Sequence, residues 1–204
     1  MRRKPAVAAA SRGRPRCFDR DHALDSALHV FWRKGYSGAS LRDLTKAMGI
    51  NRPSLYAAFG DKENLFRLTL DRYTSKYTGY FEDALKQPTA RTFARRLLLG
   101  AADSMCEKQN PSGCLLVQGA LASGDDGEGV RRELSSRRQA GEAIVRQRLK
   151  RAKAERDLPA GADPVALARF LTTVTQGMAV QAASGANRTE LRKIAETALQ
   201  AWPK

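Results

Sequence analysis

Residues 31–66 read FWRKGYSGASLRDLTKAMGINRPSLYAAFGDKENLF, a run in which helix-start and helix-stop signals follow each other closely. Ser40, with Asp43 three residues later, has the form of a capping box, in which the two side chains satisfy free N–H groups at a helix start. A short helix should therefore run from Leu41 to about Met48, where Gly49 ends it.

A second short helix follows directly. Asn51 is a favourable N-cap residue, and Pro53 fits the first helical turn, because the N–H group that proline lacks would have no partner there. This helix should continue through Tyr56 to about Ala58. Two short helices joined by a glycine-containing turn are typical of a helix-turn-helix, whose second helix lies in the major groove of DNA.

Helical patterns cover the rest of the chain. One helix is predicted from Asp19, its N-cap, to Lys34, with Gly35 as its stop. A longer helix should start near Lys62, with an apolar stripe at Phe66, Leu70, Tyr73, Tyr77 and Tyr80 or Phe81. Further helices are expected at residues 89–107, 113–122, 127–156, 163–183 and 189–202. The expected fold class is all-α, with an N-terminal three-helix helix-turn-helix domain and a C-terminal helical bundle.

The stretch from Phe31 to Phe66 resembles the DNA-binding region of the tetracycline-repressor (TetR) family of transcriptional regulators. The similar positions are Gly35, Tyr36, Ser40, Leu44, Met48, Gly49, Leu55, Tyr56, Phe59, Lys62, Glu63 and Leu65. The remainder is similar to the family only in its length and helical character. We therefore expect a disordered basic arm (residues 1–17), a helix-turn-helix domain (18–62) and a helical domain for effector binding and dimerisation (63–204).

Eight residues of the motif are candidates for contact with double-stranded DNA. Ser40 and Arg42, at the start of the first helix, can reach phosphates through a hydroxyl, a backbone N–H group or a charge. Arg52 is the leading candidate for a base contact, because a guanidinium can pair with guanine through two hydrogen bonds. The other candidates are Asn51, Pro53, Ser54, Tyr56 and Lys62.

Two of these candidates, and the basic arm, have structural alternatives. Tyr56 and Lys62 resemble phosphate-contacting residues of the family; the alternatives are a tyrosine packed against the core and a solvated lysine. In the arm, Arg12 and Arg14 belong to a basic run without acidic residues. That run either enters the minor groove of DNA or is a solvated tail.

The resemblance also implies an effector pocket inside the body and a four-helix interface between two copies of the chain. The pocket candidates combine apolar walls with a few polar groups: Tyr73, Tyr77, Phe93, Leu97, Cys114, Leu116, Gln118, Thr172 and Gln176. The interface candidates form apolar stripes on the last two predicted helices: Leu171, Val174, Thr175, Met178, Leu191, Ile194, Ala198 and Leu199. Core packing within one chain is the alternative for both sets.

Cys106 and Cys114 suggest a second kind of sensing. Cys114 falls at the predicted start of a helix, whose N-terminus can lower the pKa of a thiol. This position predicts a redox- or electrophile-sensing regulator, and the alternative is an inert buried thiol. The chain has three cysteines and no C-x-x-C pair, so neither a disulfide framework nor a zinc motif is indicated, and a reducing cytoplasm is expected.

The composition narrows the function classes. Lys and Arg number 36 against 21 Asp and Glu, and the resulting charge of +15 favours a polyanionic partner such as DNA. No apolar run reaches the roughly 18–20 residues that a membrane-spanning helix needs, so no membrane association is expected. His22 and His29 both lie in the first predicted helix. Because no catalytic, metal-binding or nucleotide-binding motif is present, we expect no enzyme, no metal and no cofactor.

These observations predict a sequence-specific regulator that binds an inverted-repeat operator as a homodimer. In the TetR type such a regulator is usually a repressor that a small-molecule effector releases, which requires only that the effector prefers one of two arrangements of the dimer. A less specific architectural DNA-binding protein that acts through bulk charge is the alternative.

Overall fold

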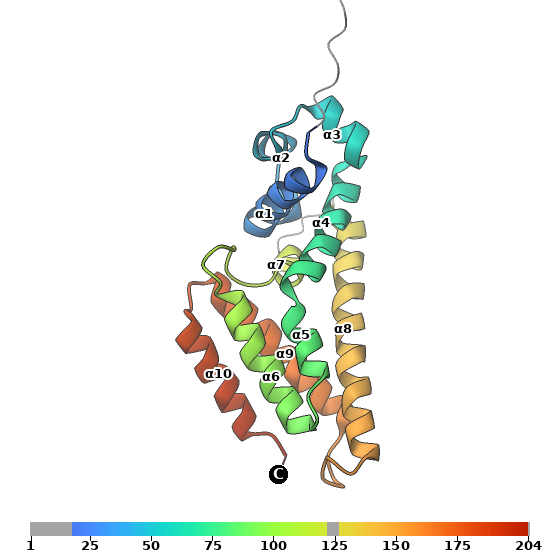
Figure 1. Ribbon diagram of the computed structural model, residues 1–204, viewed down its shortest axis with the longest axis vertical. Coiled ribbons are helices and arrows are strands. Elements are labelled where there is room, and N and C mark those ends of the chain that lie inside the picture. Colours follow the sequence, from blue (N-terminus) through green and yellow to red (C-terminus); the bar gives the residue numbers. More distant parts are fainter. Residues whose placement is uncertain (1–17, 122–126, 204) are drawn as a thin grey trace, which may run out of the picture.

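In the computed structural model, residues 18–121 and 127–203 are described, and within these ranges the chain forms ten α-helices and no strand. The expected all-helical class is confirmed. The molecule is elongated, with α1 to α3 at one end and the C-terminus at the other (Figure 1). The predicted arm, including Arg12, Arg14 and Cys17, lies outside the described residues.

Three helices form the head: α1 (Arg20–Gly38), α2 (Leu41–Met48) and α3 (Arg52–Phe59). Asp19 caps α1 as predicted, because its side chain accepts hydrogen bonds from the N–H groups of Asp21 and His22. Gly35 leaves the helical conformation (φ 68°, ψ 176°), but the helix resumes and ends at Gly38, beyond the predicted stop. Phe31, Leu44, Leu55 and Phe59 are buried between the three helices.

The long helix predicted from Lys62 through Tyr80 or Phe81 is wrong in one respect, because the chain breaks at Thr78. Helix α4 spans Lys62–Tyr77, and α5 (Gly79–Leu85) follows it. The Phe81 N–H group donates to the carbonyl of Thr78 at 2.8 Å, one residue short of its helical partner. The carbonyl of Tyr77 instead accepts from Ser104 Oγ at 3.1 Å, so a tertiary hydrogen bond replaces the helical one.

The body contains α6 (Ala90–Met105), α7 (Leu115–Leu121), α8 (Glu128–Ala154), α9 (Pro164–Ala183) and α10 (Arg188–Gln200). The predicted start of α7 at Gly113 is wrong by two residues, because Gly113 has a φ of 93° that does not belong to a right-handed helix. One apolar core joins α6, α8, α9 and α10, with Phe93, Leu149 and Leu171 buried in it.

The head and the body share buried residues rather than meeting through a linker. Leu115, Val130 and Leu134 from the body belong to the same apolar cluster as Phe31 and Phe66 of the head side. The Phe31 and Phe66 rings meet edge to face with centroids 4.9 Å apart. Packing of this density transmits displacement, so a movement of α4 is expected to carry the head with it.

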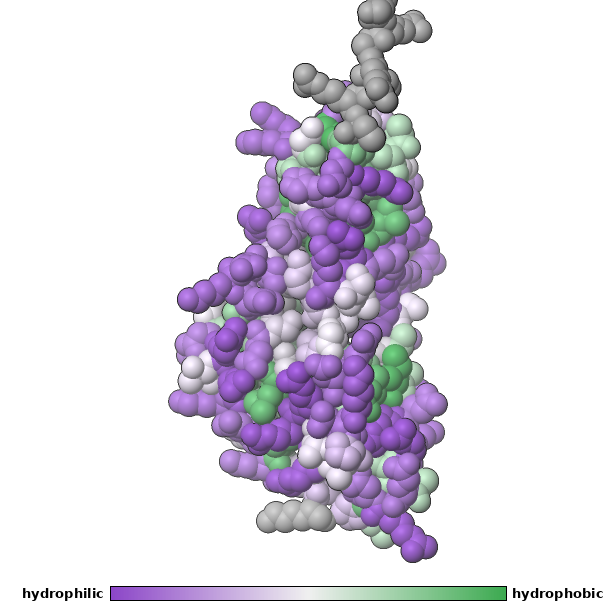
Figure 2. Space-filling view, in the orientation of Figure 1, coloured by the Kyte–Doolittle hydropathy of each residue, from purple (hydrophilic) through white to green (hydrophobic). Residues whose placement is uncertain are grey.

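The hydropathy of one face of the molecule can be followed in Figure 2. The face in Figure 2 is largely hydrophilic, with small and separate apolar areas. Across residues 18–121 and 127–203, none of the helices combines the length and apolar character that crossing a bilayer requires.

Candidate nucleic-acid interface and interior cavity

The predicted capping box at the start of α2 is present. The Asp43 N–H group donates to Ser40 Oγ at 3.1 Å, and the Ser40 N–H group donates to Asp43 Oδ2 at 3.2 Å. The Ser40 hydroxyl also donates to Asp43 at 2.8 Å, and Lys34 Nζ lies 2.9 Å from the same carboxylate. Contacts with Lys34 and Ser40 lower the pKa of Asp43 to about 2. Ser40 thus has its hydroxyl hydrogen directed at Asp43, whereas Arg42 is exposed.

Helix α3 presents a polar face outward because Leu55 and Phe59 fill the core side. Asn51 caps the helix through its side-chain oxygen Oδ1, which accepts from the Ser54 N–H group at 2.8 Å. Arg52 and Pro53 are exposed, Ser54 is half-buried, and Tyr56 keeps 48% of its surface exposed. Arg52 and Tyr56 are four residues apart and share one helix face. The structure therefore does not place Tyr56 in the core.

Lys62 begins α4, one residue after the Asp61 N-cap. Its ammonium nitrogen lies 4.4 Å from the centroid of the Tyr36 ring, in a cation–π contact that joins α4 to the end of α1. Burial lowers the pKa of the Lys62 ammonium. Lys62 is therefore half-buried on an aromatic face rather than fully solvated.

One basic residue of the same surface, Lys46, was not among the predicted DNA contacts. Lys46 is exposed in the last turn of α2, four residues after Arg42, so both side chains lie on one side of the helix. The four-residue spacing on a predicted helix was the signal that could have found it.

A cavity of about 370 Å³ that is partly open to the surface lies in the body, a size within the range of small-molecule sites. It is bounded by α4 through Thr74, by the link at Thr78, and by residues of α5 to α9. Its walls are mainly apolar: Phe81, Leu97, Met105, Leu116, Val117, Ile144 and Val145 all contribute.

Five of the nine predicted pocket residues line this cavity: Leu97, Cys114, Leu116, Thr172 and Gln176. The other four lie elsewhere. Tyr73 and Tyr77 pack edge to face on Trp32, with ring centroids 4.8 Å and 5.1 Å away. Phe93 is buried in the body core, and Gln118 donates to the Ser112 carbonyl at 2.9 Å. An apolar stripe on a helix predicts that its side chains are buried, but it does not show whether they face the core or the cavity.

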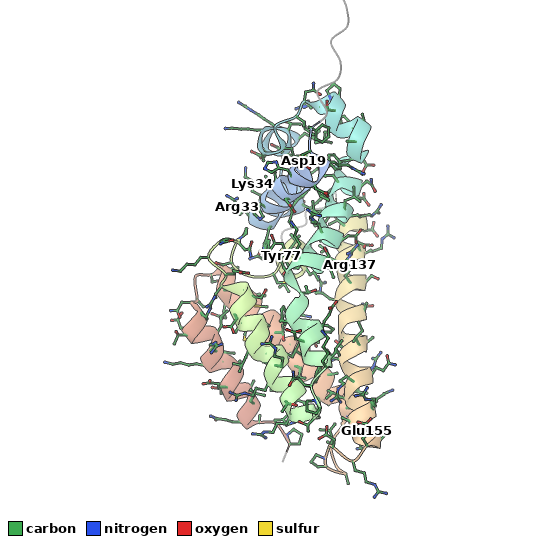
Figure 3. All side chains as sticks on the ribbon, viewed as in Figure 1. Asp19, Arg33, Lys34, Tyr77, Arg137 and Glu155 are labelled. Carbon is green, nitrogen blue, oxygen red and sulfur yellow. The ribbon has the colours of Figure 1, made fainter. Side chains whose placement is uncertain are left out.

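The sequence reasoning missed the polar residues that α8 brings to the cavity. Arg137 Nε donates to Glu133 and its Nη2 donates to Asp71, each at 2.7 Å. Arg138 Nη1 donates to the carbonyl of Leu116 at 2.7 Å, and none of the ion pairs within the described ranges involves Arg138. In Figure 3, Arg137 and Tyr77 lie at one level along the molecule, between the head and the lower part of the body.

The predicted interface stripes divide between the core and the surface. Leu171, Met178, Leu191 and Leu199 are buried within this chain, and Thr175 lines the cavity. Val174, Ile194 and Ala198 instead line a groove between α9 and α10, together with Phe170, Lys193, Thr197 and Ala201. Ile194 keeps 37% of its surface exposed there.

Comparison with known sequences relates both parts of the chain to one group of proteins. The family described as "Bacterial regulatory proteins, tetR family" matches residues 23–68, and "Tetracyclin repressor-like, C-terminal domain" matches residues 94–201. The HTH-type transcriptional repressor ComR of Escherichia coli is 36% identical over 95% of this chain and 93% of its own length. The repressor BdcR of the same organism is 34% identical over 52% of this chain and 55% of its own length.

Comparison with solved structures agrees with the sequence relatives. A cysteine variant of the TetR family transcriptional regulator CifR, complexed with 26-bp double-strand operator DNA, is 44% identical to this chain. The similarity covers 94% of this chain and 100% of that one, with a TM-score of 0.89. The fold is also shared with a TetR transcriptional regulator from Chloroflexus aurantiacus, at 20% identity and a TM-score of 0.78.

Proposed function

Because the chain belongs to the TetR family of bacterial regulatory proteins, we propose that it is a repressor that a small molecule releases from operator DNA. ComR carries the name of a transcriptional repressor, and the CifR variant was solved on its operator. Both are similar to this chain over nine-tenths or more of its length. These likenesses support repression and operator binding for this chain.

The observation that carries the release mechanism is the course of α4. This helix starts at Lys62, beside the head, and Thr74 in its fourth turn lines the 370 Å³ cavity. A ligand that fits the cavity better with α4 displaced will therefore favour a displaced head. The coupling required is about 1 to 3 kcal/mol, which corresponds to a change in DNA affinity of about 5- to 150-fold.

The exposed face of α3 is assigned to base reading, with Arg52 as the leading residue. Exposed basic residues of α2, namely Arg42 and Lys46, are assigned to the phosphate backbone. Tyr56 is exposed beside Arg52 and is assigned to a phosphate through its hydroxyl group. Lys62 is also assigned to a phosphate of the DNA. Its ammonium group lies over the Tyr36 ring, at the edge of the same surface.

The groove between α9 and α10 is assigned to a second copy of the chain. It exposes apolar side chains such as Ile194, whose burial on association is favourable. Two copies related by a two-fold axis present two recognition helices to half-sites about one helical turn of DNA, or a multiple of it, apart. Such a regulator works where the chromosomal DNA is, so we expect it in the cytoplasm.

The test is selection of bound DNA from a random pool at about physiological salt, where non-specific binding is weak. An enriched inverted repeat is expected, and binding should remain after the DNA length is cut to that repeat. Salt-sensitive binding without an enriched motif would instead favour an architectural DNA-binding protein. The same experiment with Arg52→Ala should give a motif that is degenerate at one position of each half-site.

A further inference from the structure

Cys114 differs from an ordinary buried cysteine because its side chain lines the interior cavity. It directly precedes α7, and its carbonyl accepts from the N–H groups of Val117 and Gln118 at 3.1 Å and 2.9 Å. On its other side, the Gly113 N–H group donates to the Met105 carbonyl at 3.0 Å. The backbone is thus held on both sides of the thiol. Helix α7 has only seven residues, so we assign no activation of the thiol to its N-terminus.

Two tyrosines surround this thiol. Tyr73 is buried next to Cys114, and Tyr80 lines the cavity. Burial, and then the neighbouring Cys114, raise the pKa values of both phenols. Both hydroxyl groups therefore stay protonated at neutral pH and act as hydrogen-bond donors.

Cys106 provides an internal comparison, since it does not line the cavity. Its Sγ donates to the carbonyl of Ala186 at 3.7 Å, and burial raises the pKa of its thiol. The thiolate is the nucleophilic form of cysteine, so Cys106 is held in its less reactive form. The two described cysteines thus differ in access to the cavity and in hydrogen bonding.

We propose that Cys114 is a covalent modification site that captures apolar α,β-unsaturated carbonyl compounds inside the cavity. The apolar walls fit the carbon skeleton of such a compound, and Tyr80 and Arg138 offer hydrogen-bond donors for its carbonyl oxygen. Arg138 makes no ion pair with a carboxylate in the described ranges, so its charge is available to an oxygen that becomes negative. This inference rests on the proposed function for its consequence, which is release from DNA.

The reaction needs no further reactant. The Cys114 thiol loses its proton, and Sγ forms a bond to the β-carbon of the compound while the C=C π bond breaks. The π electrons move to the carbonyl oxygen, giving an enolate that hydrogen bonds from Tyr80 and Arg138 stabilise. A proton then returns to the α-carbon, so that S–H has been added across the double bond. Nothing is oxidised or reduced, and no group leaves.

The adduct lies where it can displace the head. Tyr73 lies near Cys114 and its ring packs on Trp32 of α1, and Thr74 and Thr78 on the same segment line the cavity. Carbon atoms added at Sγ occupy volume against these side chains. An adduct that fits the cavity better with α4 displaced favours that position of α4, and α1 follows through the contact of Tyr73 with Trp32.

The chemical test uses cyclohex-2-en-1-one on a Cys17→Ser background, in which Cys106 and Cys114 are the only thiols. Peptide-resolved mass spectrometry follows the adduct on each cysteine over time. In the folded protein Cys114 should react about 10-fold faster than Cys106, and in urea the two rates should become similar. Equal rates in the folded protein, or faster reaction of Cys106, would overturn the proposal. Cyclohexanone, which has the same shape without the double bond, should give no adduct.

The functional test measures affinity for the selected operator before and after the same treatment. Treated protein should lose about 10-fold or more in affinity. Cys114→Ser should bind the operator with the parent's affinity and keep that affinity after enone treatment. Cys106→Ser should lose affinity after treatment, as the parent does. The inference is refuted if enone-treated Cys114→Ser loses operator affinity as the parent does, or if an adduct at Cys114 causes no loss of affinity. Neither result contradicts the proposed function as a repressor. Failure of the untreated protein to select any operator refutes the proposed function, while the reactivity measurement still decides the chemistry of Cys114.

Discussion

Arg72 of α4 forms a two-point ion pair with Asp25 of α1: Nε lies 2.8 Å from Oδ1 and Nη2 lies 3.0 Å from Oδ2. Lys76 Nζ lies 2.7 Å from the same carboxylate. The two helices are thus joined by charge on the outside as well as by the contact of Trp32 with Tyr73 on the inside. This double attachment explains why α4 and the head move as one piece in the proposed release.

The first prediction is that this carboxylate stabilises the fold in a pH-dependent way. Hydrogen bonds from Arg72 are the largest cause that lowers the pKa of Asp25 from 3.8 to about 2. Its contribution is therefore complete above pH 3.8 and is lost as the pH falls towards about 2. Asp25→Asn should cost about 1 kcal/mol in the free energy of unfolding near neutral pH, as measured by urea denaturation.

The control for this prediction is Asp21→Asn, whose side chain is 78% exposed and has a 3.3 Å contact with Arg72. It should change the free energy of unfolding by less than about 0.5 kcal/mol. The difference between the parent and Asp25→Asn should shrink at about pH 3. A difference that is the same at both pH values would contradict the assignment.

A second prediction separates base reading from phosphate binding. Arg52→Ala should cost about 1 to 3 kcal/mol on the operator and relax the preference at one base pair. Lys62→Ala should weaken binding to operator and random DNA alike and lower the salt slope by about 1. Fluorescence anisotropy titrations at several salt concentrations provide both numbers.

The alternative for Lys62 is a purely structural contact with Tyr36. In that case Lys62→Ala would lower the unfolding midpoint and leave the salt slope unchanged. Measuring thermal unfolding on the same samples therefore separates the two roles.

The third prediction concerns the groove between α9 and α10. Ile194→Asp places a charge in the apolar groove, so it should shift the proposed dimer to monomer, as judged by size-exclusion chromatography with light scattering. Val165→Asp serves as the control, because Val165 is 38% exposed on the same α9 but does not line the groove. An Ile194→Asp protein that remains dimeric would move the interface elsewhere.

The fourth prediction compares two glycines with positive φ. Gly49 (φ 67°) has no atom within 4 Å of an added Cβ, so Gly49→Ala should cost about 1 kcal/mol from backbone strain alone. At Gly113 (φ 93°) an added Cβ would lie 2.9 Å from the carbonyl oxygen of Ala179. Gly113→Ala should therefore cost more, about 2 to 4 kcal/mol in chemical denaturation. Equal costs would show that the turn before α7 can move away from α9.

The head was predictable because its signals are local. The Ser40 capping box, the Asn51 cap and the left-handed Gly49 each act within one helical turn, and the bounds of α2 agree with the prediction. The break at Thr78 was not predictable in the same way. It depends on Ser104, 27 residues away, which takes the carbonyl that would have continued the helix.

The residues that line the interior cavity were harder to predict from the sequence than the break at Thr78. An apolar stripe identifies the buried side of a helix but not the helix that faces it. Tyr73 and Tyr77 therefore looked like pocket residues, yet they pack on Trp32, and Arg138, which no stripe contains, lines the cavity.

The sequence by itself determined the helical class, the two-helix motif and the basic charge, because periodicity, caps and composition are properties of short segments. Only the tertiary structure decided which apolar residues fill the core, line the cavity or form the outer groove. It also decided that Arg137 and Arg138 of α8 line the cavity, together with Thr172 and Gln176 of α9. The physical reason is that these neighbours are distant in sequence and come together only when six helices pack around one space.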